Sequence, residues 1–319
     1  MAAPTTSPPG PGLPAPPAAR GAGRPRPSDT IVRSAGLTLT LLAVLVLGFV
    51  GYLYFLSGLQ EARAQTTLYA TLRGELGLAL APTGPVIPGH QASPASLATA
   101  PGDPVALLSV PAIGISDMVV VEGTSPENLT AGPGHLRDTP LPGQGGVSVV
   151  FGRRATFGAP FASLPLLSKG DTIATTTSQG VASYQVIAVS ESSKPVPFSE
   201  LPNQLLLVTA DSRFAPAHYI EVEAKLMNVV VAGTKSTTPF PSSGYLPAVS
   251  AAETALGRDS FALISAMAWA IALAAAALAG SLLAARWARW PAWVVAVPVL
   301  FAIVWNLYQS LSALLPNLQ

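Results

Sequence analysis

The pattern of apolar and polar positions divides the chain into three long apolar segments and one region of short runs. Residues 34–57, 259–285 and 290–313 are almost uninterrupted stretches of apolar side chains. At ~1.5 Å of helix per residue, each stretch is long enough to cross a hydrocarbon core of ~30 Å. The pattern therefore predicts one transmembrane helix near the N-terminus and two near the C-terminus, the last of which contains Pro298.

Residues 104–228 have a different pattern, in which short Val-, Ile-, Leu- and Tyr-rich runs alternate with clusters of Gly, Pro, Asp and Ser. Short strands at regular spacing, separated by turn residues, are typical of a barrel or a sandwich. The predicted strands are 105–110, 118–122, 147–151, 171–177, 183–189, 204–209 and 219–227. We therefore expect a mainly β domain between the first and second membrane spans.

The remaining segments are assigned from their composition. Residues 1–33 are rich in Pro, Ala and Gly, which predicts a disordered tail because such a segment cannot bury enough apolar surface. Residues 58–103 begin with a helical period of Leu and Ala and continue as an Ala-, Pro-, Gly- and Ser-rich stretch, which predicts a stem helix followed by a linker. Residues 229–258 predict a second linker.

Composition narrows the range of functions. Half of the residues are hydrophobic and only 10% are charged, as expected for several membrane spans. The net charge of +1 argues against nucleic-acid binding. The chain has no cysteine, which excludes disulfides, thiolate–metal sites and a cysteine nucleophile. With only three histidines, we expect no metal centre, and nothing in the sequence indicates a cofactor.

The positions of the arginines predict the orientation in the membrane. Arg24, Arg26 and Arg33 precede the first span, and Arg286 and Arg289 lie between the second and third spans. Cytoplasmic segments next to membrane spans carry an excess of Lys and Arg. The sequence therefore predicts a multi-pass protein of the cell membrane with a cytoplasmic N-terminus and an extracytoplasmic β domain.

A series of short motifs gives the β region a family resemblance. In chain order they are GDPV (102–105), VPAIGI (110–115), VVVEG (119–123), GPGH (132–135), TPLPGQ (139–144), GRRATFGAPF (152–161), GD (170–171) and LVTA (207–210). Their order and spacing resemble those of the sortase family of Gram-positive bacteria, particularly the actinobacterial class E. The resemblance implies a closed, sortase-like β-barrel outside the membrane.

The resemblance also indicates which positions belong to the catalytic set. Sortases are transpeptidases in which a Cys thiolate attacks a peptide bond, a His transfers protons and an Arg stabilises the oxyanion. The family's His falls on Arg153, its strand-ending Cys on Ala210, and the class E Arg, nine residues later, on Tyr219. All three residue types are replaced, so the resemblance implies a pseudoenzyme with no catalytic residue.

Residues near these positions are candidates for a retained groove: His135, Arg154, Thr209, Ser212 and Arg213. An alternative reading makes Ser212 or Thr209 the nucleophile and His135 the base of a hydrolase or transpeptidase. However, side chains alternate along a strand, so a neighbour of Ala210 does not point in the same direction. The resemblance also places the His135 motif in the fold pattern rather than in the catalytic set.

Because the shaping motifs are present and the catalytic residues are not, the sequence favours a peptide-binding or scaffold component of the cell envelope. Its expected partners are the membrane and an active sortase, a sorting-signal peptide or another envelope protein. A structural subunit of a membrane complex, which works through its three spans, is a further alternative.

Overall fold

The computed structural model describes residues 27–78, 81, 99–137, 139–193, 203–228, 250–286 and 289–319. The chain forms two compact units, Met1–Leu47 and Gly48–Gln319. The first contains most of one apolar helix. The second contains the β domain, the stem helix and the C-terminal apolar helices.

The N-terminal helical region is longer than the sequence pattern predicts. Helix α1 covers Pro27–Gly51, a π-helical turn covers Tyr52–Leu56, and α2 covers Ser57–Gly77. The helix thus begins inside the stretch assigned to the disordered tail. A proline is accepted in a first helical turn because its missing N–H would have no partner there, which explains a start at Pro27. The predicted stem helix corresponds to α2, and residues 1–26 lie outside the described residues.

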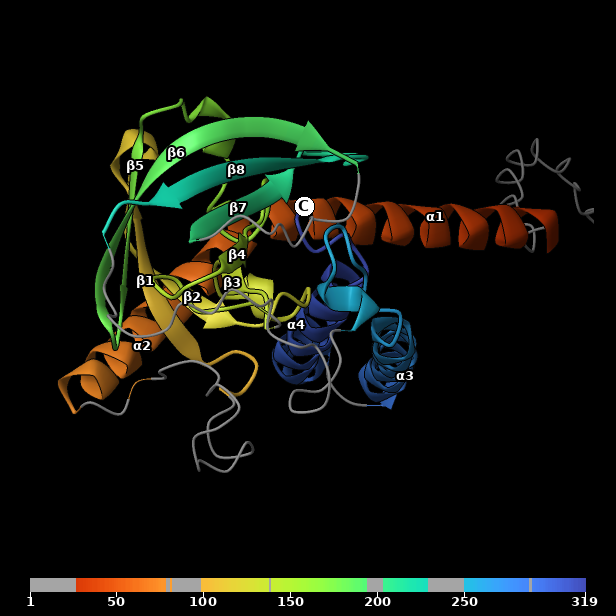
Figure 1. Ribbon diagram of the computed structural model, residues 1–319. Helices are drawn as coiled ribbons and strands as arrows, with labels where there is room; N and C mark the ends of the chain where they lie inside the picture. The colour runs from red at the N-terminus through yellow and green to blue at the C-terminus, as the bar shows by residue number, and fades with distance from the viewer. Residues whose placement is uncertain are drawn as a thin grey trace, which may run out of the picture. The chain divides into compact units, whose positions relative to one another are not determined.

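Eight strands close into a barrel, as Figure 1 shows. Their order around the barrel is β1-β2-β3-β4-β7-β8-β6-β5, and β5 pairs back with β1. The strands are β1 (Pro104–Val110), β2 (Ile115–Glu122), β3 (Gly134–His135), β4 (Val147–Phe151), β5 (Thr172–Thr177), β6 (Gly180–Ser192), β7 (Gln204–Ala210) and β8 (Tyr219–Leu226). The predicted mainly β, barrel-forming domain is confirmed. The sequence pattern missed β3, because a two-residue strand has no detectable alternation.

The strand sequences explain why the barrel has two apolar layers. Its interior is filled by one cluster of buried aliphatic and aromatic side chains, including Leu108, Val150 and Leu207. A second cluster lies on the other face of β4 and β7 and includes Phe151 and Val208. Strand β7 is therefore buried on both faces, as its continuous apolar sequence, rather than an alternating one, indicates.

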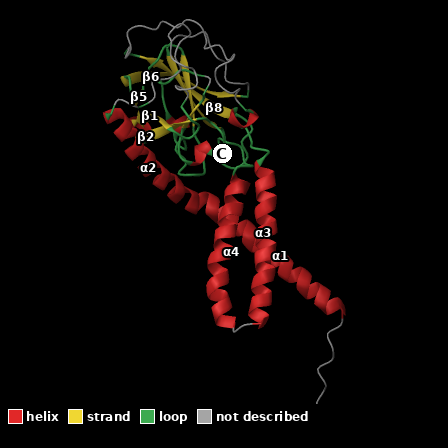
Figure 2. Cartoon of the chain, turned by 90° about the horizontal axis from the view of Figure 1, so that it is seen from below, coloured by secondary structure: helices red, strands yellow, loops and turns green. Residues whose placement is uncertain are grey.

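Two apolar helices follow the barrel. Helix α3 covers Ala262–Arg286 and α4 covers Arg289–Ser312, and they lie side by side in Figure 2. With the N-terminal helix they make three helices that are long and apolar enough to cross a membrane. This agrees with the predicted number and order of spans.

The segments directly before α3 and directly after α4 are packed on the barrel, which the sequence pattern did not predict. Residues 250–257, at the end of the predicted second linker, form a short 3₁₀ helix at Ala251–Glu253 with a capping box between Ser250 and Glu253. Residues 313–319, which we call the docked segment, follow α4 and end with buried residues. Most of both predicted linkers lies outside the described residues.

Candidate functional site

The positions that the resemblance assigns to catalysis meet at one end of the barrel. Strands β4 and β7 are parallel neighbours, with Phe151 paired to Val208, so their C-terminal ends lie together. Arg153 follows β4, Ala210 is the last residue of β7, and Tyr219 is its direct partner at the start of β8. The fold therefore brings these three positions together, although they lie far apart in the sequence.

Ala210 and Tyr219 belong to an apolar environment. Ala210 is fully buried and Tyr219 nearly so, in the cluster on the outer face of β4 and β7. The same cluster contains Leu318 of the docked segment. A side chain at position 210 therefore faces packed hydrocarbon, an environment that does not favour a charged nucleophile.

Arg153 is a structural, fully buried residue. Its guanidinium donates hydrogen bonds to the main-chain oxygens of Leu129 (Nε, 3.1 Å), Pro126 (Nη2, 2.7 Å) and Gln319 (Nη1, 3.4 Å). Nη1 also donates to the hydroxyl of Thr156 at 3.2 Å, and Cζ lies 4.7 Å from the centre of the Phe157 ring. Burial lowers the pKa of Arg153 to about 9, so the side chain is still charged at neutral pH.

Arg154, the next residue, has a contrasting environment. Its main-chain N–H donates to the carbonyl of Leu318 at 2.8 Å. Within the described chain, its buried Nε and Nη1 atoms have no hydrogen-bond partner. Burial lowers the pKa of Arg154, and repulsion by Arg213 lowers it further, while Asp211 acts in the opposite direction. The guanidinium of Arg153, by contrast, is enclosed and has a partner for each of its three nitrogens.

His135 is placed as a structural residue. It is almost fully buried, with Nδ1 3.0 Å from Oε2 of Glu122 and Nε2 3.0 Å from the carbonyl oxygen of Pro140. The carboxylate and the carbonyl can each accept a hydrogen bond from the ring, and Nε2 also lies 3.0 Å from the hydroxyl of Thr139. Burial lowers the pKa of His135, but the charge and hydrogen bond of Glu122 and the Pro140 carbonyl outweigh this effect and raise it.

The two candidate hydroxyl nucleophiles have other partners. Thr209 is fully buried and its Oγ1 donates to the carbonyl of Gly152 at 2.8 Å. Ser212 lies in the loop after β7, where its Oγ accepts a hydrogen bond from the N–H of Ala215 at 3.3 Å. Among the described residues no hydrogen bond joins His135 to either hydroxyl. In its described part the structure therefore does not bring the alternative nucleophiles and His135 together.

One group of charged side chains near this site was not found from the sequence, from which we expected no metal centre. Nδ1 of His218 lies 3.4 Å from Oε1 of Glu191 and 3.5 Å from Oδ2 of Asp211. The ligand atoms of these three residues all lie within 4.8 Å of one another, a spacing that can hold a metal ion. The partners come from β6, the end of β7 and the loop before β8, so only the barrel topology unites them.

These features define a class: a membrane protein with a closed eight-stranded barrel, whose site is built at the ends of two parallel strands. Residues 108–236 match the model of the Sortase domain. Over these residues the chain is similar to the sortase family, as the motif resemblance implies. No curated protein sequence matches it.

Solved sortase structures are similar to the barrel. A sortase D5 transpeptidase of Clostridium perfringens is 21% identical over 52% of this chain and 99% of its own, with a TM-score of 0.41. Sortase E of Streptomyces avermitilis is 29% identical over 40% of this chain and 91% of its own, with a TM-score of 0.34. Since these TM-scores are low, the sortase similarity depends on the domain match over residues 108–236.

Proposed function

We propose that this protein is a catalytically inactive, sortase-like component of the cell envelope that binds peptide segments or acts as a scaffold. The observation that supports the proposal is the environment of Ala210. The chain has no thiol, the position expected for it is a buried alanine, and Leu318 covers the same face. Loss of the nucleophile from a catalytic set typically costs roughly a million-fold in rate, so residual sortase turnover is not expected.

The neighbouring positions support the same proposal. A general base must reach the proton that it accepts, and both ring nitrogens of His135 are already bound inside the barrel by Glu122, Pro140 and Thr139. At the position that corresponds to the family's histidine, Arg153 uses its donors to join main-chain oxygens of the barrel and of the docked segment. Residues of the former site thus stabilise the fold.

The proposed location is the cell membrane, with the N-terminus in the cytoplasm and the barrel outside. The chain has three candidate spans. With a cytoplasmic N-terminus, three crossings place the docked segment on the same, outer side of the membrane as the barrel. The arginines on either side of the spans favour this orientation over the inverted one.

The experiment uses the full-length protein in detergent with a panel of sorting-signal peptides, and it records binding and turnover in the same samples. An active sortase serves as the positive control, and the Ser212→Ala and Thr209→Ala variants test the alternative nucleophiles. We expect saturable binding without turnover. Turnover that survives both substitutions would show that the catalytic positions are misassigned. Turnover that either one abolishes would support hydroxyl chemistry instead.

A structural role is the second candidate, favoured by the packing of both ends of the α3–α4 pair on the barrel. In that case the same samples show neither binding nor turnover. Co-purification of membrane partners with the full chain, but not with a chain whose α3–α4 pair is exchanged for an unrelated apolar hairpin, would then identify the spans as the functional part.

A further inference from the structure

The outer face of β4 and β7 is covered by a segment of the same chain. We call this surface the β4–β7 face, and it consists of Val149, Phe151, Leu206, Val208 and Ala210. Leu318 packs in the same cluster and has no exposed surface. Burying a leucine side chain to this extent stabilises the contact because it removes apolar surface from water. The docked segment therefore binds this face through a specific apolar contact.

The main chain of the docked segment is also bound at several points. The N–H of Gln319 donates to the carbonyl of Pro316 at 3.0 Å, which closes a tight turn. The Leu318 carbonyl accepts the N–H of Arg154, and the hydroxyl of Thr156 donates to the main-chain oxygen of Gln319 at 2.6 Å. These contacts fix the turn directly above the end of β4, in the manner of a bound peptide.

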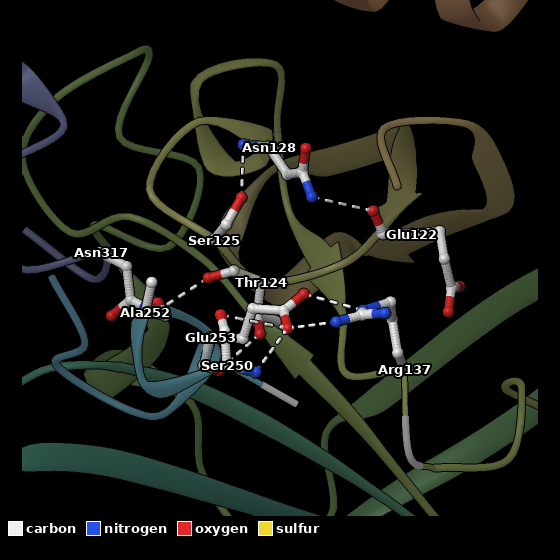
Figure 3. A network of polar contacts seen from close by, with 9 residues as sticks. All are labelled: Glu122, Thr124, Ser125, Asn128, Arg137, Ser250, Ala252, Glu253 and Asn317. Carbon is white, nitrogen blue, oxygen red and sulfur yellow. Dashed lines mark hydrogen bonds and ion pairs between the residues drawn. The ribbon is translucent and has the colours of Figure 1, made fainter. Parts of the chain in front are cut away.

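Asn317 gives the contact its polar specificity. Its fully buried Nδ2 donates to the carbonyls of Thr124 (2.9 Å), Thr254 (2.9 Å) and Ala252 (3.3 Å). Figure 3 shows Asn317 beside Ala252 of the segment before α3, both on the same side of Thr124 of the barrel. Three acceptors directed at one amide nitrogen select an amide and disfavour a carboxylate, which would face three oxygens without a donor.

The segment before α3 is itself held on the barrel and completes the site. Arg137 forms a two-point ion pair with Glu253, in which Nε lies 2.8 Å from Oε1. The hydroxyl of Thr124 donates to the carbonyl of Glu253 at 2.6 Å, as Figure 3 also shows. A two-point guanidinium–carboxylate pair is strong and directional, so it keeps the carbonyl of Ala252 in place for Asn317.

We propose that residues 316–319 are a resident peptide ligand of the β4–β7 face. We also propose that this face binds a partner peptide of the same chemistry, a tight turn with an asparagine followed by an aliphatic residue, when the resident turn leaves. The second statement rests on the proposed peptide-binding function, whereas the first does not. The docked segment is connected to α4, so an event that displaces the helix pair also uncovers the face.

The absence of native cysteine allows a direct test by site-specific cross-linking in membranes. The full chain with Ala210→Cys and Leu318→Cys is treated with a short bifunctional thiol reagent. The matched control pairs Leu318→Cys with Val181→Cys, an exposed residue on β6. Tyr219, the strand partner of Ala210, pairs on its other side with Ser192 of β6, and Val181 lies eleven residues before Ser192. At ~3.3 Å per residue, this places the control thiol roughly 36 Å along the strand from the site.

We expect an intramolecular cross-link for the first pair and at least ten-fold less for the control pair. Equal yields would overturn the docking, and a cross-linked dimer would show that a second copy supplies the turn. Adding Asn317→Asp to the first pair should reduce its yield several-fold. The same change at Asn228, an exposed residue whose Nδ2 donates to a single carbonyl, should not.

The exchange is tested in the same assay with a synthetic peptide of sequence LLPNLQ. A tethered segment acts at an effective concentration of about millimolar, so the peptide is used in the millimolar range. We expect a several-fold lower cross-linking yield with this peptide, and no change with its Asn-to-Asp version. A yield that neither peptide alters would overturn the exchange and leave the docked segment as a permanent structural contact. A failure of turnover or of sorting-signal binding does not affect the cross-linking result.

Discussion

Two adjacent arginines provide the most direct comparison of a satisfied with an unsatisfied buried charge in this protein. Arg153→Met removes a guanidinium whose donors reach three main-chain oxygens and one hydroxyl. Arg154→Met removes a guanidinium with two buried nitrogens that have no partner within the described chain. Methionine keeps the length and apolar stem in both cases, so the comparison isolates the polar group.

The expected magnitudes differ because the partners differ. Replacing Arg153 leaves buried oxygens of Leu129 and Pro126 without a donor, and each such orphan costs roughly 1–3 kcal/mol. The variant also loses the contact with the Phe157 ring, worth about 1 kcal/mol. Relief from burying the charge offsets part of this, so we expect a net loss of about 3–5 kcal/mol. For Arg154 we expect a change of less than about 1 kcal/mol.

The assay is thermal unfolding of the full-length protein in detergent, measured at one scan rate. For a domain of this size, a loss of 3 kcal/mol corresponds to a decrease in Tm of roughly 6–12 °C. Arg153→Met should therefore melt well below the wild type, and Arg154→Met close to it. Equal decreases for both variants, or a larger one for Arg154, would refute the reasoning that hydrogen-bond satisfaction decides the cost.

Three other properties follow from the structure. The folded-state pKa of His135 is raised above its usual value of about 6.5, so its imidazolium stabilises the fold below that pH. Tm should therefore fall as the pH rises through the folded pKa, and His135→Gln should remove this dependence. At Gly134 an added Cβ would collide with a main-chain oxygen, so Gly134→Ala should destabilise the barrel. At Gly74 in helix α2 an added Cβ meets open space, so Gly74→Ala should stabilise the protein by up to about 1 kcal/mol, as measured by denaturant unfolding. Tyr184→Phe, which removes the hydroxyl that accepts the N–H of Gly143, should lower the free energy of unfolding by about 1–2 kcal/mol, and an unchanged midpoint would contradict this.

The sequence pattern was a good guide wherever structure depends on local periodicity. Long apolar runs predicted three spanning helices, and short apolar runs separated by turn residues predicted seven of the strands. Strand β3 was missed because its two residues, Gly134 and His135, are ordered only by pairing with β2 and β4. A strand of two residues is stabilised by pairing with the neighbouring strands, and it is too short to show a periodicity in the sequence.

At the site, the sequence determined which residue types are present and which chemistry they exclude. The missing cysteine was evident at once, and the motifs indicated which positions to compare. The continuous apolar run of β7 also carried an unused signal, since a strand exposed on one face would alternate. That run required a cover on both faces, but it could not identify the cover.

Only the tertiary structure decided how these residues are used. Arg153 is buried because oxygens from Leu129, Pro126 and the distant Gln319 converge on it, and such convergence has no sequence period. Leu318 and Asn317 lie in a short segment after an apolar helix, where composition gives no reason to expect docking. The strand order and the α3–α4 hairpin bring residues that are far apart in the chain into contact. A sequence pattern reflects only interactions between residues that are close together along the chain.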